Sequence, residues 1–398
     1  QQELDAFRVK VRDWLAENKP GDPGFVMPQN GLTITTQQQF DFLRAWQRQL
    51  YDAGFVGVEW QVQYGGQGLA PGHQDVISQE LLRSGAPFLL NIVGLGWAGP
   101  IILSRGTEAQ KQRFLQKILS AEEVWCQGFS EPNSGSDLAS LQTRAQRDGD
   151  DYVINGQKVW TSQGAYAEYM ILLARTDPTV PKHAGISYFL LPMHTRGVEV
   201  KPIFKITGEG GFNQVFFTDV RIPADALLGE EGQGWSMAVE TLSFERGVSE
   251  GSGGGDNTGG RQGVQAVMDL VLSLKRDGKP LIDDPVVRDK LAAFDIEATA
   301  LQYNAQRAKI PGLVSGRPMS LPLTRKITTT EHEQRLADYI CELQGYMGSL
   351  WKGDPAALEA GEWQRRYFNS YSGTIAGGTS EILRNVVGEK VLNLPKTR

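Results

Sequence analysis

Cysteine and histidine are scarce in this chain. Its 398 residues include two cysteines, Cys126 and Cys341, and four histidines. Two cysteines are too few for a disulfide framework or a cysteine metal cluster, and the histidines lack the close spacing of metal ligands. The composition therefore predicts a reducing compartment and no metal site.

Long apolar runs are also missing. No stretch approaches the roughly 18 to 20 apolar residues that a membrane helix needs, and Gln1 to Asp5 lack the charged-then-apolar order of a signal peptide. Forty basic and 46 acidic residues leave a net charge of −6, which gives no electrostatic reason to bind nucleic acid. We expect a cytoplasmic protein that binds neither a membrane nor nucleic acid.

The spacing of the apolar residues changes twice along the chain. From Leu4 to about Ile118 they recur at helical spacing, from about Trp125 to Leu228 the segments are short and rich in β-branched and aromatic residues, and after Gly234 the helical period returns. A chain of this length is expected to form two or three domains. We predict a helical domain over 1–124, a β domain over 125–232 and a second helical domain over 233–398.

The middle segment contains several strand candidates. Asn155-Gly156 accepts the positive φ angles of a tight turn, so we predict a hairpin between Tyr152–Ile154 and Gln157–Trp160. Helices are expected over Val264–Leu274, Leu291–Ala308 and Thr328–Met347. Further strands are expected at Tyr169–Ala174, Ile186–Leu191, Val198–Ile203 and Val215–Val220.

Two common motif spellings carry little weight. Gly94 to Gly99 has the dinucleotide-binding spacing, but Pro100 follows at once and no βαβ unit surrounds it. Gly247 to Gly251 matches the nucleophile elbow of hydrolases, but it follows a helical pattern instead of a strand. Nucleotide-binding sheets and hydrolases are therefore minor alternatives.

Three longer strings, taken together, resemble the signatures of the acyl-CoA dehydrogenase family. They are Trp125–Leu138, Asn155–Ser162, and Ile375–Ile382 followed by Arg384. The resemblance implies an α+β fold with an N-terminal α-helical domain, a middle β-barrel or sandwich domain, and a C-terminal four-helix-bundle domain. It also implies FAD as the cofactor.

The resemblance assigns flavin contacts position by position. An aromatic side chain such as Trp160 can pack on the apolar ring, while hydroxyls and amides can bond its polar edge. In the middle segment the implied contacts are Gln127, Phe129, Ser130, Trp160, Thr161 and Ser162. Contacts to the adenosine and pyrophosphate, partly from a neighbouring subunit, are implied for Gln344, Gly345, Gly348, Thr379 and Glu381.

The subunit contact implies a homodimer, a homotetramer or an assembly with a related chain. One departure concerns the pyrophosphate. The family usually presents an Arg-x-x-Phe-Gly string where this chain has Leu274–Pro280, so Arg276 or Lys275 is the candidate substitute, although Asp277 opposes the phosphate.

The catalytic base also departs from the common family pattern. Many members place a glutamate in the closing signature, where this chain has Gly377. A minority, resembling isovaleryl and long-chain enzymes, place it on a C-terminal-domain helix directly before an arginine, and here Glu245 precedes Arg246. Glu245 is therefore the candidate base, with Arg246 supporting the pocket. The Gly377 amide would hold the thioester carbonyl, and Ser136 matches a substrate contact.

The implied reaction is FAD-dependent α,β-dehydrogenation of an acyl-CoA to the trans-2-enoyl-CoA, with electrons passed to an electron-transfer flavoprotein or a similar acceptor. By the resemblance, the seven glycines between Gly251 and Gly263 line up with the helix that walls the acyl pocket. The resemblance therefore implies a wide cavity for a long, branched or bulky chain from fatty acid or sterol side-chain breakdown. Two alternatives remain open. One is an oxygen-using flavin oxidase or monooxygenase on the same fold, and the other is a FAD-binding, non-catalytic subunit of a heteromeric complex.

Overall fold

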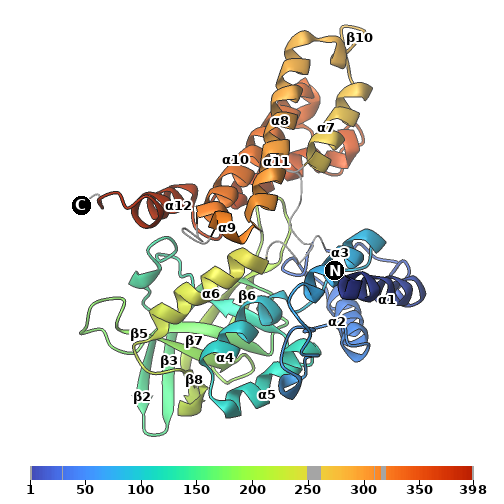
Figure 1. Cartoon of the computed structure of the whole chain (residues 1–398). Coiled ribbons are helices and arrows are strands. Elements are labelled where there is room, and N and C mark those ends of the chain that lie inside the picture. Colours follow the sequence, from blue (N-terminus) through green and yellow to red (C-terminus); the bar gives the residue numbers. More distant parts are fainter. Residues whose placement is uncertain (1, 29, 249–260, 309, 315–319, 397–398) are drawn as a thin grey trace. The chain divides into compact units, whose positions relative to one another are not determined.

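The computed structural model describes residues 2–28, 30–248, 261–308, 310–314 and 320–396. The chain divides into two compact units, Gln1–Gly255 and Asp256–Arg398. Each unit has its own hydrophobic core, and each is described below by itself (Figure 1). The predicted three-way division at 124/125 and 232/233 stays a prediction.

The first unit begins with helices, as the apolar spacing predicts. Threonine capping boxes with Gln39 and Gln110 start the second and fifth of them. Arg8 and Arg12 on α1 donate to Glu80 on α3 at 3.1 and 3.0 Å, which ties these two helices together. The helices are α1 (Gln2–Asn18), α2 (Gln37–Asp52), α3 (His73–Ser84), α4 (Gly99–Arg105) and α5 (Glu108–Leu119).

Gly94–Ala98 forms a π-helical turn that leads directly into α4. The buried Asn91 side chain accepts hydrogen bonds from the backbone amides of Gly94 and Trp125 and donates to Ile118 and Glu123. Asn91 therefore connects the helices to the first strand. No strand precedes Gly94 among the described residues, although a dinucleotide-binding site would require one. The glycines here instead allow close packing of the helices.

The middle segment of the chain forms an eight-stranded, mostly antiparallel sheet, in the order β6-β7-β3-β2-β4-β5-β8, with β1 parallel to β4. The strands predicted from Tyr169, Ile186 and Val198 are confirmed as β4, β5 and β6, and β7 extends beyond the predicted Val215–Val220. The bounds are β1 (Trp125–Gly128), β2 (Arg144–Asp148), β3 (Asp151–Ser162), β4 (Tyr169–Arg175), β5 (Ile186–Pro192), β6 (Val198–Ile203), β7 (Phe212–Pro223) and β8 (Leu227–Leu228).

The predicted hairpin at Asn155-Gly156 is wrong. β3 runs straight through both residues, with a register shift against β7 between Ile154 and Gly156, while the turn lies earlier, at Gly149 between β2 and β3. Gly156 has a φ of +151°, and a Cβ there would lie 2.6 Å from the Cα of Thr143. The glycine therefore marks a bulge and a close backbone approach, the other common reason for glycine inside a strand.

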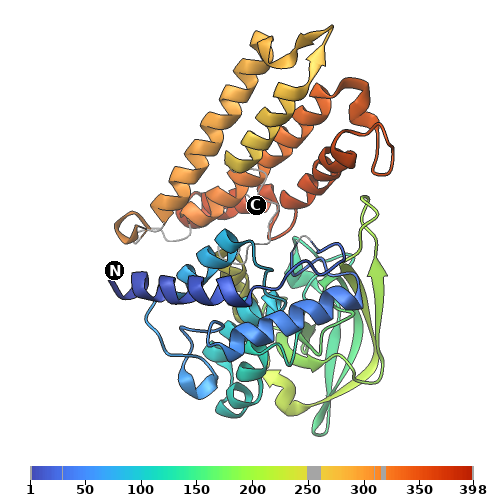
Figure 2. The ribbon, with the colours of Figure 1, turned by 90° about the vertical axis from the view of Figure 1, so that its right-hand side faces the viewer.

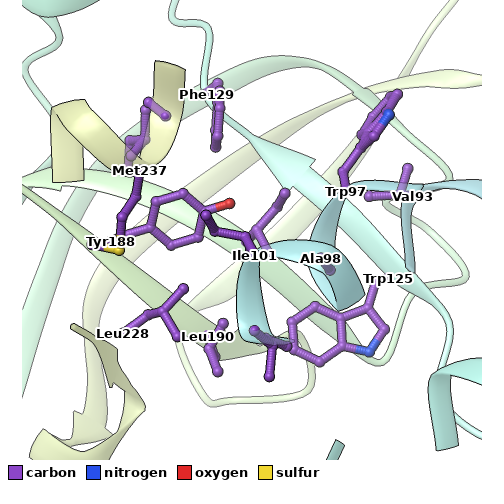
Figure 3. Packing of buried hydrophobic residues seen from close by; sticks show 14 of the residues in the cluster. Val93, Trp97, Ala98, Ile101, Trp125, Phe129, Tyr188, Leu190, Leu228 and Met237 are labelled. Carbon is purple, nitrogen blue, oxygen red and sulfur yellow. The ribbon is translucent and has the colours of Figure 1, made fainter. Parts of the chain in front are cut away.

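Both faces of the central strands are buried. On β4, Ile171 and Leu173 join one apolar cluster, and Met170 and Leu172 join another. The first cluster also takes side chains from α4 and from α6 (Gly234–Val248), which lie beside each other (Figure 1). Figure 3 shows the interior of this cluster, where Phe129, Tyr188 and Met237 meet.

The second unit is a helical bundle. Its core includes Val264, Leu291, Phe294 and Leu336, and the long helices run alongside one another (Figure 2). The three predicted helical stretches are confirmed, although the last ends at Leu343. The helices are α7 (Arg261–Ser273), α8 (Pro285–Ala308), α9 (Pro311–Val314), α10 (Ser320–Leu343), α11 (Glu362–Gly373) and α12 (Ser380–Val386). Within the described ranges, no helix combines the length and the apolar character needed to cross a bilayer.

Candidate functional site

A second bulge on β3 turns an aromatic ring outward. The pairing with β7 shifts between Lys158 and Thr161, and Trp160 between them has a φ of +62°. Its side chain is 57% exposed and meets Phe212 edge-on at 5.8 Å. A left-handed backbone at a bulky residue costs free energy and is found mainly at functional sites. The strained bulge therefore presents Trp160 as a flat, accessible apolar surface.

The segment after β1 lies beside this bulge. The amide of Val159 donates to the carbonyl oxygen of Ser130 at 2.9 Å. Near this junction, Gln127 Nε2 and Thr161 Oγ1 are buried and have no hydrogen-bond partner among the described residues. Buried polar atoms are normally paired, so two orphans beside an exposed indole need an explanation. A flat heteroaromatic ligand with polar edges would provide the missing partners.

These features fit the predicted isoalloxazine of FAD. The bond from Val159 places Ser130 beside the β3 bulge, and Gln127 lies three residues before Ser130, on β1. These two residues, with Trp160, Thr161 and the half-buried Ser162 of β3, are called the patch below. The patch offers the stacking surface and the polar groups that a flavin ring requires.

Phe129 lies in the same segment, but its ring packs in the hydrophobic core. The ring is 4% exposed and packs edge-on against Tyr188 at 5.8 Å, inside the core cluster (Figure 3). Its carbonyl oxygen accepts from Lys158 at 3.0 Å. The predicted contact of Phe129 with flavin is therefore one that its backbone, and not its ring, would make.

Lys158 is the group that sequence reasoning missed. Its side chain is fully buried, and its ammonium lies 2.9 Å from the carboxylate of Glu131. Burial lowers the pKa of Lys158 to about 8 against the attraction of Glu131, so the lysine is mostly protonated at neutral pH. Burial also acts on Glu131, but Lys158 and hydrogen bonds from residues 142 and 143 outweigh it and lower the pKa of that carboxyl. A lysine within a predicted strand, directly before Val159 and Trp160, was the available signal.

The candidate base lies on α6. Tyr188 Oη on β5 and Thr241 Oγ1 on α6 are 3.1 Å apart and buried, and Glu240 pairs with Arg105 at 2.8 Å. These contacts fix α6 within the first unit. Helical register puts Glu245 one turn beyond Thr241. The side chains of Glu245 and of its neighbour Arg246 lie outside those the structure describes.

The predicted substrate contact Ser136 is exposed on the loop after β1. Asp137 next to it pairs with Lys182 at 2.7 Å, and the hydroxyl of Ser134 donates to the Asp137 carbonyl oxygen at 2.6 Å. These bonds give the loop a defined shape. Most of the glycine-rich stretch behind the wide-cavity prediction and most of the hydrolase-like string lie outside the described residues.

The second unit holds the other predicted cofactor contacts. Gln344 is 7% exposed; its Oε1 accepts from Gln364 at 3.0 Å, and its Nε2 has no partner among the described residues. Gly345 has a φ of +57°, and a Cβ on Gly348 would lie 2.3 Å from the carbonyl oxygen of Cys341. This turn therefore needs both glycines and leaves the amide of Gln344 as an unused donor.

The closing signature forms the turn before α12. Gly377 and Gly378 have φ angles of +63° and +96°, which glycine adopts without strain. Thr379 is the N-cap of α12 and accepts from the amide of Ile382 at 3.2 Å. Thr379 and the exposed Glu381 border a groove of about 350 Å³ in this unit. The two residues thus line one concave surface, as contacts to a single ligand must.

Arg276 lies on a short hairpin of Lys275–Arg276 and Lys279–Pro280. Its guanidinium is 55% exposed and lies 3.8 Å from the carboxylate of Asp284. Asp277 and Gly278 form the turn, with φ angles of +52° and +77°. A role for Arg276 at the pyrophosphate stays a prediction.

Comparisons with known proteins agree with this picture along the whole chain. Family models described as the acyl-CoA dehydrogenase N-terminal, middle and C-terminal domains match residues 1–122, 126–220 and 232–392. The acyl-CoA dehydrogenase IpdE1 of Mycobacterium tuberculosis is 38% identical over 397 residues and 99% of each chain. IpdE1 of Mycolicibacterium smegmatis is 38% identical over 99% of this chain and 98% of that protein.

Solved structures show the same similarity. The Tcur3481-Tcur3483 steroid ACAD is 29% identical with a TM-score of 0.81, over 100% of this chain and 99% of that one. The ChsE4-ChsE5 complex from Mycobacterium tuberculosis is 29% identical with a TM-score of 0.77, over the same shares. The predicted family, fold class and cofactor are therefore confirmed: the chain belongs to the acyl-CoA dehydrogenase family and is a FAD-dependent acyl-CoA dehydrogenase.

Proposed function

We propose that this acyl-CoA dehydrogenase forms the trans-2-enoyl thioester of a long, branched or bulky acyl-CoA, with Glu245 as the base. The observation that carries the proposal is the Trp160 bulge together with the buried Gln127 Nε2 and Thr161 Oγ1, which have no partner among the described residues. These groups suit a flavin ring bound within the first unit. α6, which carries Glu245, is fastened to the same unit through Thr241. The relation to a steroid ACAD supports a bulky acyl group.

The proposed roles follow from the chemistry of a thioester. Its α-proton is weakly acidic, so a carboxylate must be positioned to remove it, and Glu245 takes that role. The Gly377 amide, in a turn that glycine alone forms without strain, donates to the thioester carbonyl as negative charge develops there. FAD, when bound, accepts the β-hydrogen as a hydride. Arg246 supports the pocket, and Ser136 binds near the carbonyl.

We also propose that the enzyme acts as an oligomer. Val286, Ile296 and Tyr303 on α8 are 67%, 69% and 61% exposed, which gives that helix an apolar outer face. In the same unit, the buried Nε2 of Gln344 has no hydrogen-bond partner within the described ranges. Both features suit an assembly in which a neighbouring chain, either a second copy or a related subunit, completes the cofactor site. One of the solved structures named above is the ChsE4-ChsE5 complex.

An anaerobic titration tests the proposal. The purified protein, alone or with a co-purifying partner, is titrated with butyryl-CoA, a branched acyl-CoA and a steroid-derived acyl-CoA, and bleaching of the flavin band is followed. We expect the bulky substrates to reduce the flavin at the lowest concentrations. Preferential reduction by butyryl-CoA would contradict the substrate proposal. Rapid oxygen consumption by the reduced enzyme would instead identify an oxidase.

A further inference from the structure

The buried ammonium of Lys158 joins the two segments that carry the proposed flavin contacts. These are the segment after β1, at Phe129–Glu131, and the β3 bulge, at Lys158–Thr161. The Lys158 Nζ lies 3.0 Å from the carbonyl oxygen of Phe129 and 2.9 Å from Glu131 Oε1. We propose that Lys158 is a positioning residue for the cofactor: it holds the segment after β1 against the β3 bulge and so sets the spacing between the flavin-facing groups of the two segments. The inference rests on the proposed flavin contacts.

The geometry makes Lys158 the central tie between these segments. Glu131, its partner, also accepts from the amides of Gln142 and Thr143 at 2.6 and 2.8 Å. The carboxylate is thus fixed by the backbone on one side and by Lys158 on the other. Lys158 holds the segment at Phe129 and at Glu131, on either side of Ser130.

The position of Lys158 within β3 connects this tie to the bulge. Lys158 is the last residue paired in register before the shift, and Trp160 lies two residues further on. Gln127 precedes the Phe129 carbonyl by two residues on the other segment. A change at Lys158 therefore acts at once on the indole surface and on the buried donor Gln127.

The free energy of burying charge indicates that the Lys158–Glu131 pair serves to fix positions and adds little stability. Removing two charges from water costs several kcal/mol per ion, and the attraction between them rarely returns more than that. Glu131 and Arg175 are the charged groups that act on Lys158, and Arg175 opposes its charge. An apolar pair of the same volume could match the stability but would give no directional bonds to the Phe129 carbonyl or to the amides of Gln142 and Thr143.

The test compares flavin binding with folding in the complete protein. Three variants are used: Lys158→Met, the double variant Lys158→Met/Glu131→Gln, which leaves no unpaired buried charge, and the control Lys182→Met. Lys182, between β4 and β5, pairs at 2.7 Å with Asp137 of the segment after β1, and both side chains are exposed, at 46% and 63%. The FAD dissociation constant, the flavin absorption spectrum, the temperature of FAD release and the temperature of unfolding by circular dichroism are measured.

We expect Lys158→Met and the double variant to bind FAD at least tenfold more weakly, with an altered flavin band. In the double variant the temperature of FAD release should fall by more than the temperature of unfolding, whereas Lys182→Met should match the wild type in both.

A double variant that binds FAD with wild-type affinity and spectrum would overturn the inference. This result is decisive even where Lys158→Met does not fold. A wild type that binds FAD but bleaches with no acyl-CoA would contradict the proposed function and leave this inference standing.

Discussion

At the scale of single residues, the sequence departs from the common family pattern at two positions that are linked. A glutamate is missing at Gly377, and a glutamate is present at Glu245. Gly377 replaces the usual glutamate in a turn whose backbone is left-handed, where a side chain would be strained. Glu245 supplies a carboxylate on α6 instead. We therefore propose that the chain keeps one acidic group for the reaction, contributed by another element.

Replacing Glu245 by Gln tests that assignment. The amide cannot accept the α-proton, so we expect flavin reduction by substrate to slow by about 10²- to 10⁴-fold. FAD content and acyl-CoA binding should stay unchanged. Stopped-flow absorbance under anaerobic conditions measures the rate, and undiminished reduction would place the base elsewhere.

Glu80 gives a second test at this scale, through pH. The hydrogen bond from Arg12, helped by Arg8 and opposed by burial, holds the pKa of Glu80 below its usual value of 4.5. A carboxyl whose pKa is lower in the folded state stabilises the protein above its unfolded pKa, and this contribution is lost as the pH falls through the folded value.

We therefore expect Glu80→Gln to lower Tm at pH 7 by about 2–4 °C, as for a loss of roughly 1 kcal/mol. The difference from the wild type should shrink below about pH 4. Differential scanning calorimetry at the two pH values measures it, and a difference that is independent of pH would refute the assignment.

At the scale of elements, β3 carries most of what is specific to the site. Its first bulge lets the strand pass close to Thr143, and its second turns Trp160 outward. Bulges bend a strand and redirect its side chains without interrupting the sheet. One long strand thereby provides both a core layer and the exposed indole that we propose as a ligand surface.

Gly156→Ala probes the first bulge. The new Cβ would lie 2.5 Å from Thr143 Oγ1 and 2.6 Å from its Cα, and backbone cannot yield as a flexible side chain can. We expect a loss of about 1–3 kcal/mol in the free energy of unfolding, measured by urea denaturation. Gly135→Ala is the control, because open space surrounds that position.

At the scale of the whole molecule, the apolar outer face of α8 predicts assembly. Ile296→Glu places a charge where we expect a neighbouring chain to pack, and burial of an unpaired charge is costly. We expect subunit association to weaken at least about tenfold, with loss of bound FAD. Light scattering coupled to gel filtration measures the assembly. Gln302→Glu, an exposed change on another side of α8, should leave it intact.

The sequence by itself determined the family, the cofactor and the order of elements. Helical spacing predicted α7, α8 and α10, and short segments rich in β-branched and aromatic residues predicted β4, β5 and β6, because these patterns reflect local geometry and burial. The signature strings pointed to Gln127, Trp160 and Thr161 by resemblance. The wide-pocket argument and the side chain of Glu245 stay predictions.

Only the tertiary structure decided how β3 is used. Asn155-Gly156 is compatible with either a hairpin turn or a bulge, and the approach of Thr143 and the pairing with β7 select the bulge. The Lys158 pair with Glu131 joins residues 27 positions apart in the chain, which no local pattern encodes. Contacts between distant segments determine which local option is populated, because burial and backbone pairing outweigh the small intrinsic preference of a dipeptide.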